Sequence, residues 1–309
     1  MKNEERSGMA FAALSYIIWG VLPIYWKWLD GITANEILAN RVLWSFVFVL
    51  LILMTTGKLG NLLQTAGYLK KNPKILGSLV IASLLVTGNW FIYIWAVNSD
   101  QIVEASLGYY INPLISILLG VFFLREKLTR AQILSFLIAA AGVGILTFSY
   151  GKFPWVALSL ALTFGLYGLA KKLIKVESVI GLTLETMTVT PLAIVYLVYL
   201  SFQGKLSLFH TSAVNEFLLM GAGVVTAIPL LLFAKGAQKI PLYMLGFLQY
   251  IAPTIMLILG VFFYNEPFSM VQIGAFICIW TAVLITTISN MKWLHTKAGK
   301  WKKGKTFQA

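Results

Sequence analysis

The sequence has little charge, few histidines and a single cysteine. Of its 309 residues, 11% are charged and 59% are hydrophobic, and the mean hydropathy is +0.83. A soluble domain of this size cannot bury so much apolar surface, so the composition indicates an integral membrane protein. Cys278 has no second cysteine to pair with, and His210 and His295 lie in polar segments without a Cys/His cluster. We therefore expect no disulfide, no metal and no cofactor.

Motifs of soluble enzymes and of ATP-driven proteins are also missing. The chain contains no Walker A loop, no HExxH and no GxSxG sequence, which predicts that it is not an enzyme. The first apolar run, residues 8–26, is longer than the apolar core of a signal peptide and lacks a small-x-small cleavage site. We interpret it as a membrane-spanning helix.

Long apolar runs fill the rest of the chain. About 20 apolar residues are needed to cross a bilayer as a helix. Ten segments meet this requirement, and the connections between most of them are very short, so the sequence predicts an all-α integral membrane protein without a soluble domain. The predicted segments are 8–29, 34–56, 74–97, 103–124, 131–150, 153–171, 179–202, 215–236, 242–264 and 268–290.

The distribution of lysine and arginine predicts the orientation of these segments. With the N-terminus in the cytoplasm, the inside loops and the tail hold nearly all of the 24 basic residues. The outside loops hold Lys27, Lys152 and Lys205, and Arg41 lies within a span. Positive charge accumulates on the cytoplasmic side of membrane proteins, so we expect a multi-pass protein of the cell membrane with both termini inside. The net charge of +13 is then a topology signal, and no nucleic-acid partner is expected.

One segment occurs twice. Residues 110–136 align with residues 250–276 without a gap, and nearly half of the aligned positions are identical. Apolar helices resemble one another by composition, but matched proline, glycine, glutamate and glutamine residues indicate a duplication. The matched residues include Tyr110/Tyr250, Pro113/Pro253, Gly120/Gly260, Glu126/Glu266 and Gln132/Gln272.

The duplication predicts how the chain is divided. We expect a first five-helix repeat over residues 1–150, a second over residues 151–290, and a basic cytoplasmic tail over residues 291–309. Five is an odd number, so the second repeat must be inverted in the membrane relative to the first. The loop charges agree, because Arg125 and Lys127 of the first copy are replaced by Asn265 and Pro267 in the second. Inverted-topology repeats are common in secondary transporters.

A few polar residues fall within the predicted spans, where they are costly and tend to face a cavity or one another. Asn89 and Tyr93 are four residues apart and share a helix face. Glu104 and Asn112 lie on one stripe of the next span. Each proline of the repeated segment leaves a carbonyl without its helical donor, at Tyr109 for Pro113 and at Gln249 for Pro253, and we interpret both prolines as structural hinges.

Each of these residues also has a purely structural interpretation. Arg41 and Glu104 are expected toward the same side of the membrane, where they could form a structural ion pair, and Glu104 is also a candidate coupling group. Glu185 could reach the cytoplasmic headgroups or take part in coupling. Trp26 is interpreted as an interfacial residue, whereas Trp19 and Trp90 lie deeper and could line a pocket. A proline kink commonly only shapes packing.

Several motifs resemble those of the EamA-type drug/metabolite transporters, and within them the RarD-like branch of chloramphenicol-sensitivity-type permeases. The resemblance covers nearly the full chain. It implies a five-plus-five inverted repeat with cytoplasmic termini and a central cavity lined by the first, third, fourth, sixth, eighth and ninth helices. The motifs are residues 36–45, 89–98, 104–114, 185–186, 226–234 and 245–254.

The sequence thus predicts a secondary active or facilitative transporter, an exporter of a small amphipathic metabolite, amino-acid-like solute or drug by alternating access. Its partners would be the solute, the lipid bilayer and, as coupling ion, protons. The alternatives are a membrane flippase or enzyme acting on a lipid-linked substrate, and a sensor or assembly subunit that does not transport. The expected substrate-binding residues are Trp19, Asn89, Trp90, Tyr93, Tyr109, Tyr110, Asn112, Gln249 and Tyr250, with Arg41, Glu104 and Glu185 for coupling or ion pairing.

Overall fold

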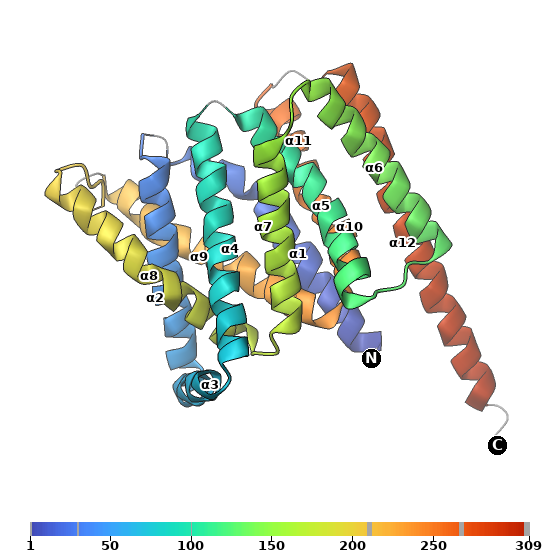
Figure 1. Cartoon of the computed structure of the whole chain (residues 1–309), viewed down its shortest axis with the longest axis horizontal. Helices are drawn as coiled ribbons and strands as arrows, with labels where there is room; N and C mark the ends of the chain where they lie inside the picture. The colour runs from blue at the N-terminus through green and yellow to red at the C-terminus, as the bar shows by residue number, and fades with distance from the viewer. Residues whose placement is uncertain (1, 30, 100, 209–211, 266–268, 306–309) are drawn as a thin grey trace.

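A computed structural model describes residues 2–29, 31–99, 101–208, 212–265 and 269–305. Within these residues the chain is helical and contains no strands, and its long helices lie side by side (Figure 1). Among these described residues, ten helical segments are long and apolar enough to cross a membrane, which confirms the prediction of ten spans. His210, Glu266 and Pro267 lie outside the described residues.

The helices of the first half, in chain order, are α1 (Lys2–Lys27), α2 (Ala34–Thr55), α3 (Leu59–Lys71), α4 (Pro73–Asn98), α5 (Ile102–Leu124) and α6 (Arg130–Tyr150). Those of the second half are α7 (Trp155–Leu173), α8 (Ser178–Phe202), α9 (Ala213–Lys239), α10 (Leu242–Gln249), α11 (Ile251–Ile258), a π-helical turn at Leu259–Phe263, and α12 (Met270–Lys305).

The two copies of the repeated segment differ in their backbone. In the first copy, α5 continues through Pro113 as one helix. In the second copy, the helix is interrupted at Tyr250, three residues before Pro253, and ends in the π-helical turn. A proline within a helix removes one backbone hydrogen bond and clashes with the preceding turn, and neighbouring helices decide whether a kink or a break results. Of the two hinges expected at the prolines, the one in the second copy is therefore a break in the helix. In the first copy the helix is uninterrupted at Pro113.

The helix contacts of the two halves correspond. If each helix is replaced by its counterpart in the other half, the same pairs of helices are in contact. Helix α1 packs on α9 and on α11, while α7 packs on α4 and on α5; α2 packs on α9, while α8 packs on α4. The remaining close pairs join equivalent helices of the two halves, namely α2 with α8, α5 with α10 and α6 with α12. Two repeats related by a two-fold axis produce this pattern of contacts.

Helix α3 is an element that hydropathy did not predict, because it is too short and too polar to span. It packs on α4 and α8 and buries Leu69, while Lys70 and Lys71 remain exposed in its last turn. Figure 1 shows α3 nearly end-on, whereas α2 and α4 are seen from the side, so it lies across the ends of the spanning helices. One buried face and a basic end are typical of a helix that lies in the membrane interface.

Candidate functional site

A cavity of about 160 Å³ lies among α1, α2, α4, α5, α7, α10 and α11. Its lining runs along α1 from Trp26, next to the end of that helix, to Tyr16 in its middle. The cavity therefore occupies the half of the molecule in which α1 ends and α2 begins. Aromatic side chains form much of its wall: Tyr16, Trp19, Trp26, Trp90, Tyr93, Tyr109 and Phe164.

The structure brings most of the predicted site residues together in this cavity. Trp19, Arg41, Asn89, Trp90, Tyr93, Tyr109, Asn112, Gln249 and Pro253 all line it. The set of lining helices differs from the expected one, because α2 contributes Arg41 directly while α9, the eighth span, contributes Thr226 behind that residue. Tyr110, Tyr250, Pro113, Glu104 and Glu185 lie elsewhere.

Arg41 is the cation of the cavity. Its Nε donates a hydrogen bond to Thr226 Oγ1 at 3.0 Å, and its guanidinium lies over the rings of Trp26 and Trp90, 4.6 and 4.7 Å from the centroids. Among the described residues no carboxylate pairs with it. A guanidinium that lies over two indole rings is oriented by cation–π contacts and keeps its terminal N–H donors for a further partner.

Trp26 is thus a cavity residue, not the interfacial residue that its position near a helix end suggested. Its spacing gives a signal that could have revealed this. Tyr16, Trp19, Pro23 and Trp26 follow one another at intervals of three and four residues and share a face of α1, and all four line the cavity.

The predicted ion pair between Arg41 and Glu104 is wrong. The Glu104 carboxylate is buried and accepts hydrogen bonds from the backbone N–H of Val156 at 2.6 Å and from the Tyr150 hydroxyl at 2.9 Å. Val156 lies in the first turn of α7, where unpaired N–H groups and the helix dipole favour an anion. Glu104 therefore holds the start of α7 in place.

Three amide side chains line the cavity, and they differ in how their hydrogen bonds are satisfied. The Asn89 amide nitrogen donates to the Leu160 carbonyl at 2.8 Å and to Thr163 Oγ1 at 2.9 Å, which ties α4 to α7. In contrast, Asn112 Oδ1 and Gln249 Oε1 are buried and have no hydrogen-bond partner among the described residues. A buried acceptor without a donor is costly, and native proteins seldom keep one without a functional reason.

Neighbouring tyrosines of the repeated segment point in different directions. Tyr109 lines the cavity and packs edge-on against Tyr93, with ring centroids 5.9 Å apart. Tyr110 instead packs against Phe276 of α12, and Tyr250 is buried in the hydrophobic cluster that α5 forms with α6 and α12. Successive helix residues are about 100° apart, so one lines the cavity while the next supports the scaffold.

Aromatic rings close one end of the cavity. Phe233 of α9 lies at the centre of this cluster, 5.6 Å from Trp19 and 5.4 Å from Phe164, both of which line the cavity. Tyr167 stacks on Phe233, with an interplanar angle of 12° and ring centroids 5.8 Å apart. The end of the molecule that contains the start of α1 is therefore packed, whereas the cavity lies beyond this cluster.

Comparison with known proteins agrees with this architecture. The sequence model of the EamA-like transporter family matches residues 6–148. An uncharacterized transporter of Bacillus subtilis, YojE, is 52% identical over 94% of this chain and 96% of its own length. The RarD protein of Escherichia coli is 39% identical over 92% of this chain and 94% of its own length. A solved crystal structure that is 18% identical shares the fold, with a TM-score of 0.69 over 91% of this chain and 98% of that chain.

The chain belongs to the EamA-like transporter family. It is a multi-pass membrane transporter of the drug/metabolite superfamily, which confirms the resemblance seen in the sequence. Relatives named as transporters are consistent with the prediction that it is not an enzyme.

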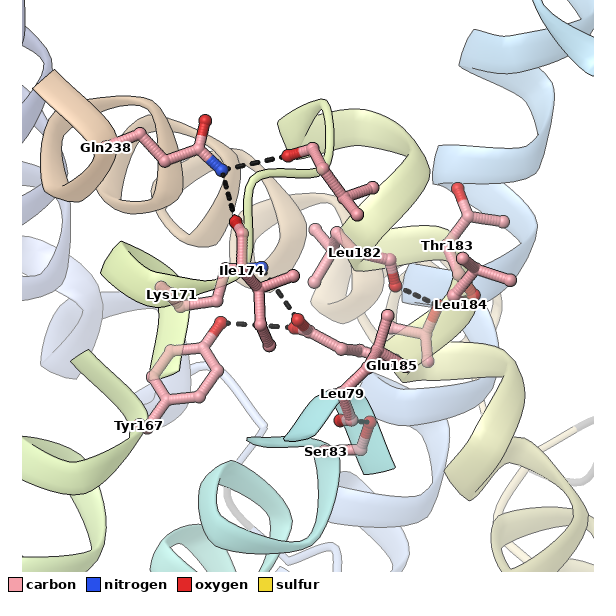
Figure 2. Close-up of polar contacts among 12 residues, drawn as sticks. Leu79, Ser83, Tyr167, Lys171, Ile174, Leu182, Thr183, Leu184, Glu185 and Gln238 are labelled. Atoms are coloured by element: carbon pink, nitrogen blue, oxygen red, sulfur yellow. Dashed lines mark hydrogen bonds and ion pairs between the residues drawn. The ribbon is translucent and has the colours of Figure 1, made fainter. Parts of the chain in front are cut away.

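This EamA-family chain also contains a buried charged pair, shown in Figure 2. Lys171 of α7 and Glu185 of α8 lie 2.7 Å apart, Nζ to Oε1, and their side chains are 4% and 2% exposed. The Tyr167 hydroxyl lies 3.4 Å from the other carboxylate oxygen. Glu185 therefore does not reach toward the headgroups, as one interpretation of the sequence had it, but faces α7 inside the protein.

Proposed function

We propose that this protein is a secondary transporter that binds a small zwitterionic, amino-acid-like solute in the cavity around Arg41. The observation that carries the proposal is the pairing of an uncompensated guanidinium with two unpartnered amide oxygens in the same cavity. A carboxylate would accept from Arg41, and an ammonium would donate to Asn112 and Gln249. The aromatic wall would contact the apolar part of the solute.

The depth of these groups supports a zwitterion of modest length. Arg41 is the eighth residue of α2, which is about 10 Å from the start of that helix. Asn112 lies in the middle of α5, and Gln249 lies at the break in the second copy of the repeated segment. A volume of about 160 Å³ suits a solute of amino-acid size better than a drug-sized one.

Transport would proceed by alternating access between the two repeats, residues 1–150 and 151–290, with the tail at 291–309 in the cytoplasm. The exchange-symmetric packing of the two halves and the swapped loop charges support an inverted repeat. With both termini cytoplasmic, the cavity lies in the outer half of the membrane and the aromatic cluster closes the inner half. The net direction would be export, with protons as the coupling ion.

A matched set of probes tests the substrate class on the purified protein. Phenylalanine carries both charges, phenethylamine lacks the carboxylate, and phenylpropionate lacks the ammonium. We expect phenylalanine to raise the melting temperature most and to be transported by proteoliposomes. Arg41→Gln should weaken its binding about tenfold or more, because a charge-assisted pair contributes about 1.5–3 kcal/mol. Lys152→Gln, outside the cavity, is the control, and equal responses to all three probes would contradict the proposal.

A further inference from the structure

Three glutamates are fully buried among the described residues, and their partners differ in kind. Glu36 accepts from the backbone N–H groups of Ser207 and Leu208, at 2.7 and 3.2 Å. Glu104 accepts from the backbone N–H of Val156 and, at its other oxygen, from the Tyr150 hydroxyl. Glu185 instead accepts from two side chains, Lys171 and Tyr167. A backbone donor at a helix start or in a loop cannot leave without local unfolding, whereas a lysine side chain can leave by rotating about its own bonds. Of the three, Glu185 is the carboxylate that only side chains hold, so all of its partners can change within an intact fold.

The surroundings of Glu185 contain few other charges. From α7 it faces Lys171 and Tyr167, while the residues around it from α2, α4 and α9 are hydroxyl-bearing or apolar. Lys172 points away and donates to the Ile240 carbonyl at 2.5 Å, and Gln238 bonds the Ile174 and Val176 carbonyls (Figure 2). The nearest described acid along α8 is Glu177, which precedes the helix and pairs with Lys58 at the surface.

A small cavity beside Glu185 is next to the substrate cavity. It has a volume of about 20 Å³, enough for one water molecule, and Ser45, Ser83 and Thr186 line it together with Glu185. Trp90 lines both this cavity and the larger one, so a single indole separates them. Tyr167 gives a second connection, because it contacts Glu185 and also stacks on Phe233 in the aromatic cluster that closes the larger cavity.

Glu185 also occupies a defined place in the repeat. It is the eighth residue of α8, as Arg41 is the eighth residue of α2, and α2 and α8 pack against each other. The two halves thus place a cation and an anion at equivalent helix positions. In this structure Arg41 faces the cavity, while Glu185 is paired at the closed end.

We infer that Glu185 is the proton-binding group of the transporter and that its ion pair with Lys171 is a latch that keeps this end of the cavity closed. This inference rests on the proposed transport function. A proton from water at this end bonds to a carboxylate oxygen of Glu185 and makes it a neutral acid. Lys171 keeps its own proton, and because a buried unpaired ammonium is strongly disfavoured, its side chain moves to the water beyond the end of α7. Release of the proton reverses both steps.

The latch can be tested without a substrate. Spin labels on Lys74→Cys, at the start of α4, and Leu173→Cys, at the end of α7, report the separation of the two halves at the closed end; both positions are exposed. The native cysteine is removed by Cys278→Ala. On acidification we expect a longer-distance population to grow in the otherwise unchanged protein. Glu185→Gln should show that population at every pH, with loss of the pH-dependent shift.

Two further variants separate a proton site from a merely structural pair. Glu177→Gln removes the exposed acid of the same segment and should leave the pH-dependent shift intact. The double variant Glu185→Gln with Lys171→Met has no charge left at this site, so it should remain folded, as checked by gel filtration, and its label distance should be insensitive to pH. A pH-insensitive distance in the protein with both residues intact, or a pH-dependent shift that survives Glu185→Gln, would overturn the inference.

A flux measurement distinguishes failure of the latch from failure of transport. Proteoliposomes that contain a pH-sensitive dye are given phenylalanine with and without a pH gradient. We expect gradient-driven accumulation to be lost in Glu185→Gln while exchange of labelled for unlabelled phenylalanine continues. If neither the unchanged protein nor Glu185→Gln transports phenylalanine, the proposed substrate is wrong. The spin-label distances then still test whether the Glu185–Lys171 pair is a latch. If accumulation persists in Glu185→Gln, the coupling role is wrong although transport stands.

Discussion

The Glu104 carboxylate accepts the backbone N–H of Val156 at 2.6 Å, so a residue near the start of α5 fixes the start of α7. Helices α5 and α7 are among the most extensively packed pairs in the molecule, and both line the cavity. The contact explains why a carboxylate lies at membrane depth without a basic partner, because the helix N-terminus supplies the compensating positive potential.

Replacement of Glu104 should therefore reduce stability without changing coupling. We expect Glu104→Ala to lower the free energy of unfolding by about 2 kcal/mol, because a buried charge-assisted hydrogen bond is lost and the Val156 N–H is left unpaired. Glu104→Gln retains an acceptor and should cost less. Melting curves in detergent measure the first effect. Loss of pH-driven flux in a well-folded Glu104→Gln protein would show that Glu104 has the coupling role that we assign to Glu185.

Gly223 allows a close approach of α2 and α9. A Cβ atom at this position would lie 2.2 Å from the Trp44 carbonyl carbon and 2.4 Å from the Ser45 backbone nitrogen, so the helices would have to separate. We expect Gly223→Ala to destabilise the protein by about 1–3 kcal/mol, as overpacking does, and to displace Arg41 one turn away. Gly77→Ala on α4 meets no atom within 4 Å and is the control, with unchanged or slightly higher stability. Equal melting temperatures for both variants would contradict this packing.

Replacing the two cavity amides that have an unpartnered oxygen, Asn112 and Gln249, should affect stability differently from replacing Asn89, whose amide nitrogen donates two hydrogen bonds. Asn112→Leu and Gln249→Met remove buried acceptors that have no donor, so stability should stay the same or rise while affinity for phenylalanine falls about tenfold. Asn89→Leu breaks two hydrogen bonds to α7 and should lower stability by about 1–3 kcal/mol. Melting temperatures with and without phenylalanine separate the two behaviours, and a stability loss at Asn112 equal to that at Asn89 would count against the assignment.

Glu126 provides a contact between the two halves at the closed end. Its two carboxylate oxygens accept the backbone N–H groups of Leu242 and Tyr243, at 2.7 and 2.9 Å, and so cap the start of α10. We expect Glu126→Ala to cost about 1 kcal/mol, the usual effect of losing a helix cap, and to lengthen the Lys74–Leu173 label distance without removing its pH dependence. A pH-insensitive distance in this variant would assign the proton site to Glu126 instead of Glu185.

Much of the architecture could be predicted from the sequence. Spans and their number follow from apolar length, because backbone groups in lipid must be satisfied within each helix. The cavity residues Asn89, Tyr109 and Gln249 could also be predicted, because a polar side chain at membrane depth seeks a cavity or a partner. The comparison of the two copies helped as well, since matched Tyr110 and Tyr250 lie in the scaffold while unmatched Tyr109 and Gln249 line the cavity.

The partners of the charged residues could not be predicted. Glu104 and Val156 are 52 positions apart, and Arg41 and Thr226 are 185 apart, so no local pattern joins them. The sequence suggested that Arg41 and Glu104 meet because both lie toward one side of the membrane, but depth alone does not fix the direction in which a side chain points.

By itself, therefore, the sequence determined that this chain has ten membrane-spanning segments, that one of its segments occurs twice, and at what depth its polar groups lie. The tertiary structure decided which way each spanning helix is turned, and so which side chains face the cavity, the neighbouring helix or the lipid. The physical reason is that helices such as α2 and α5 are apolar on nearly every face, so hydrophobicity sets their depth but not their rotation. Close packing against neighbours, as at Gly223, sets the rotation and thereby leaves Arg41 over the rings of two tryptophans and Glu185 beside Lys171.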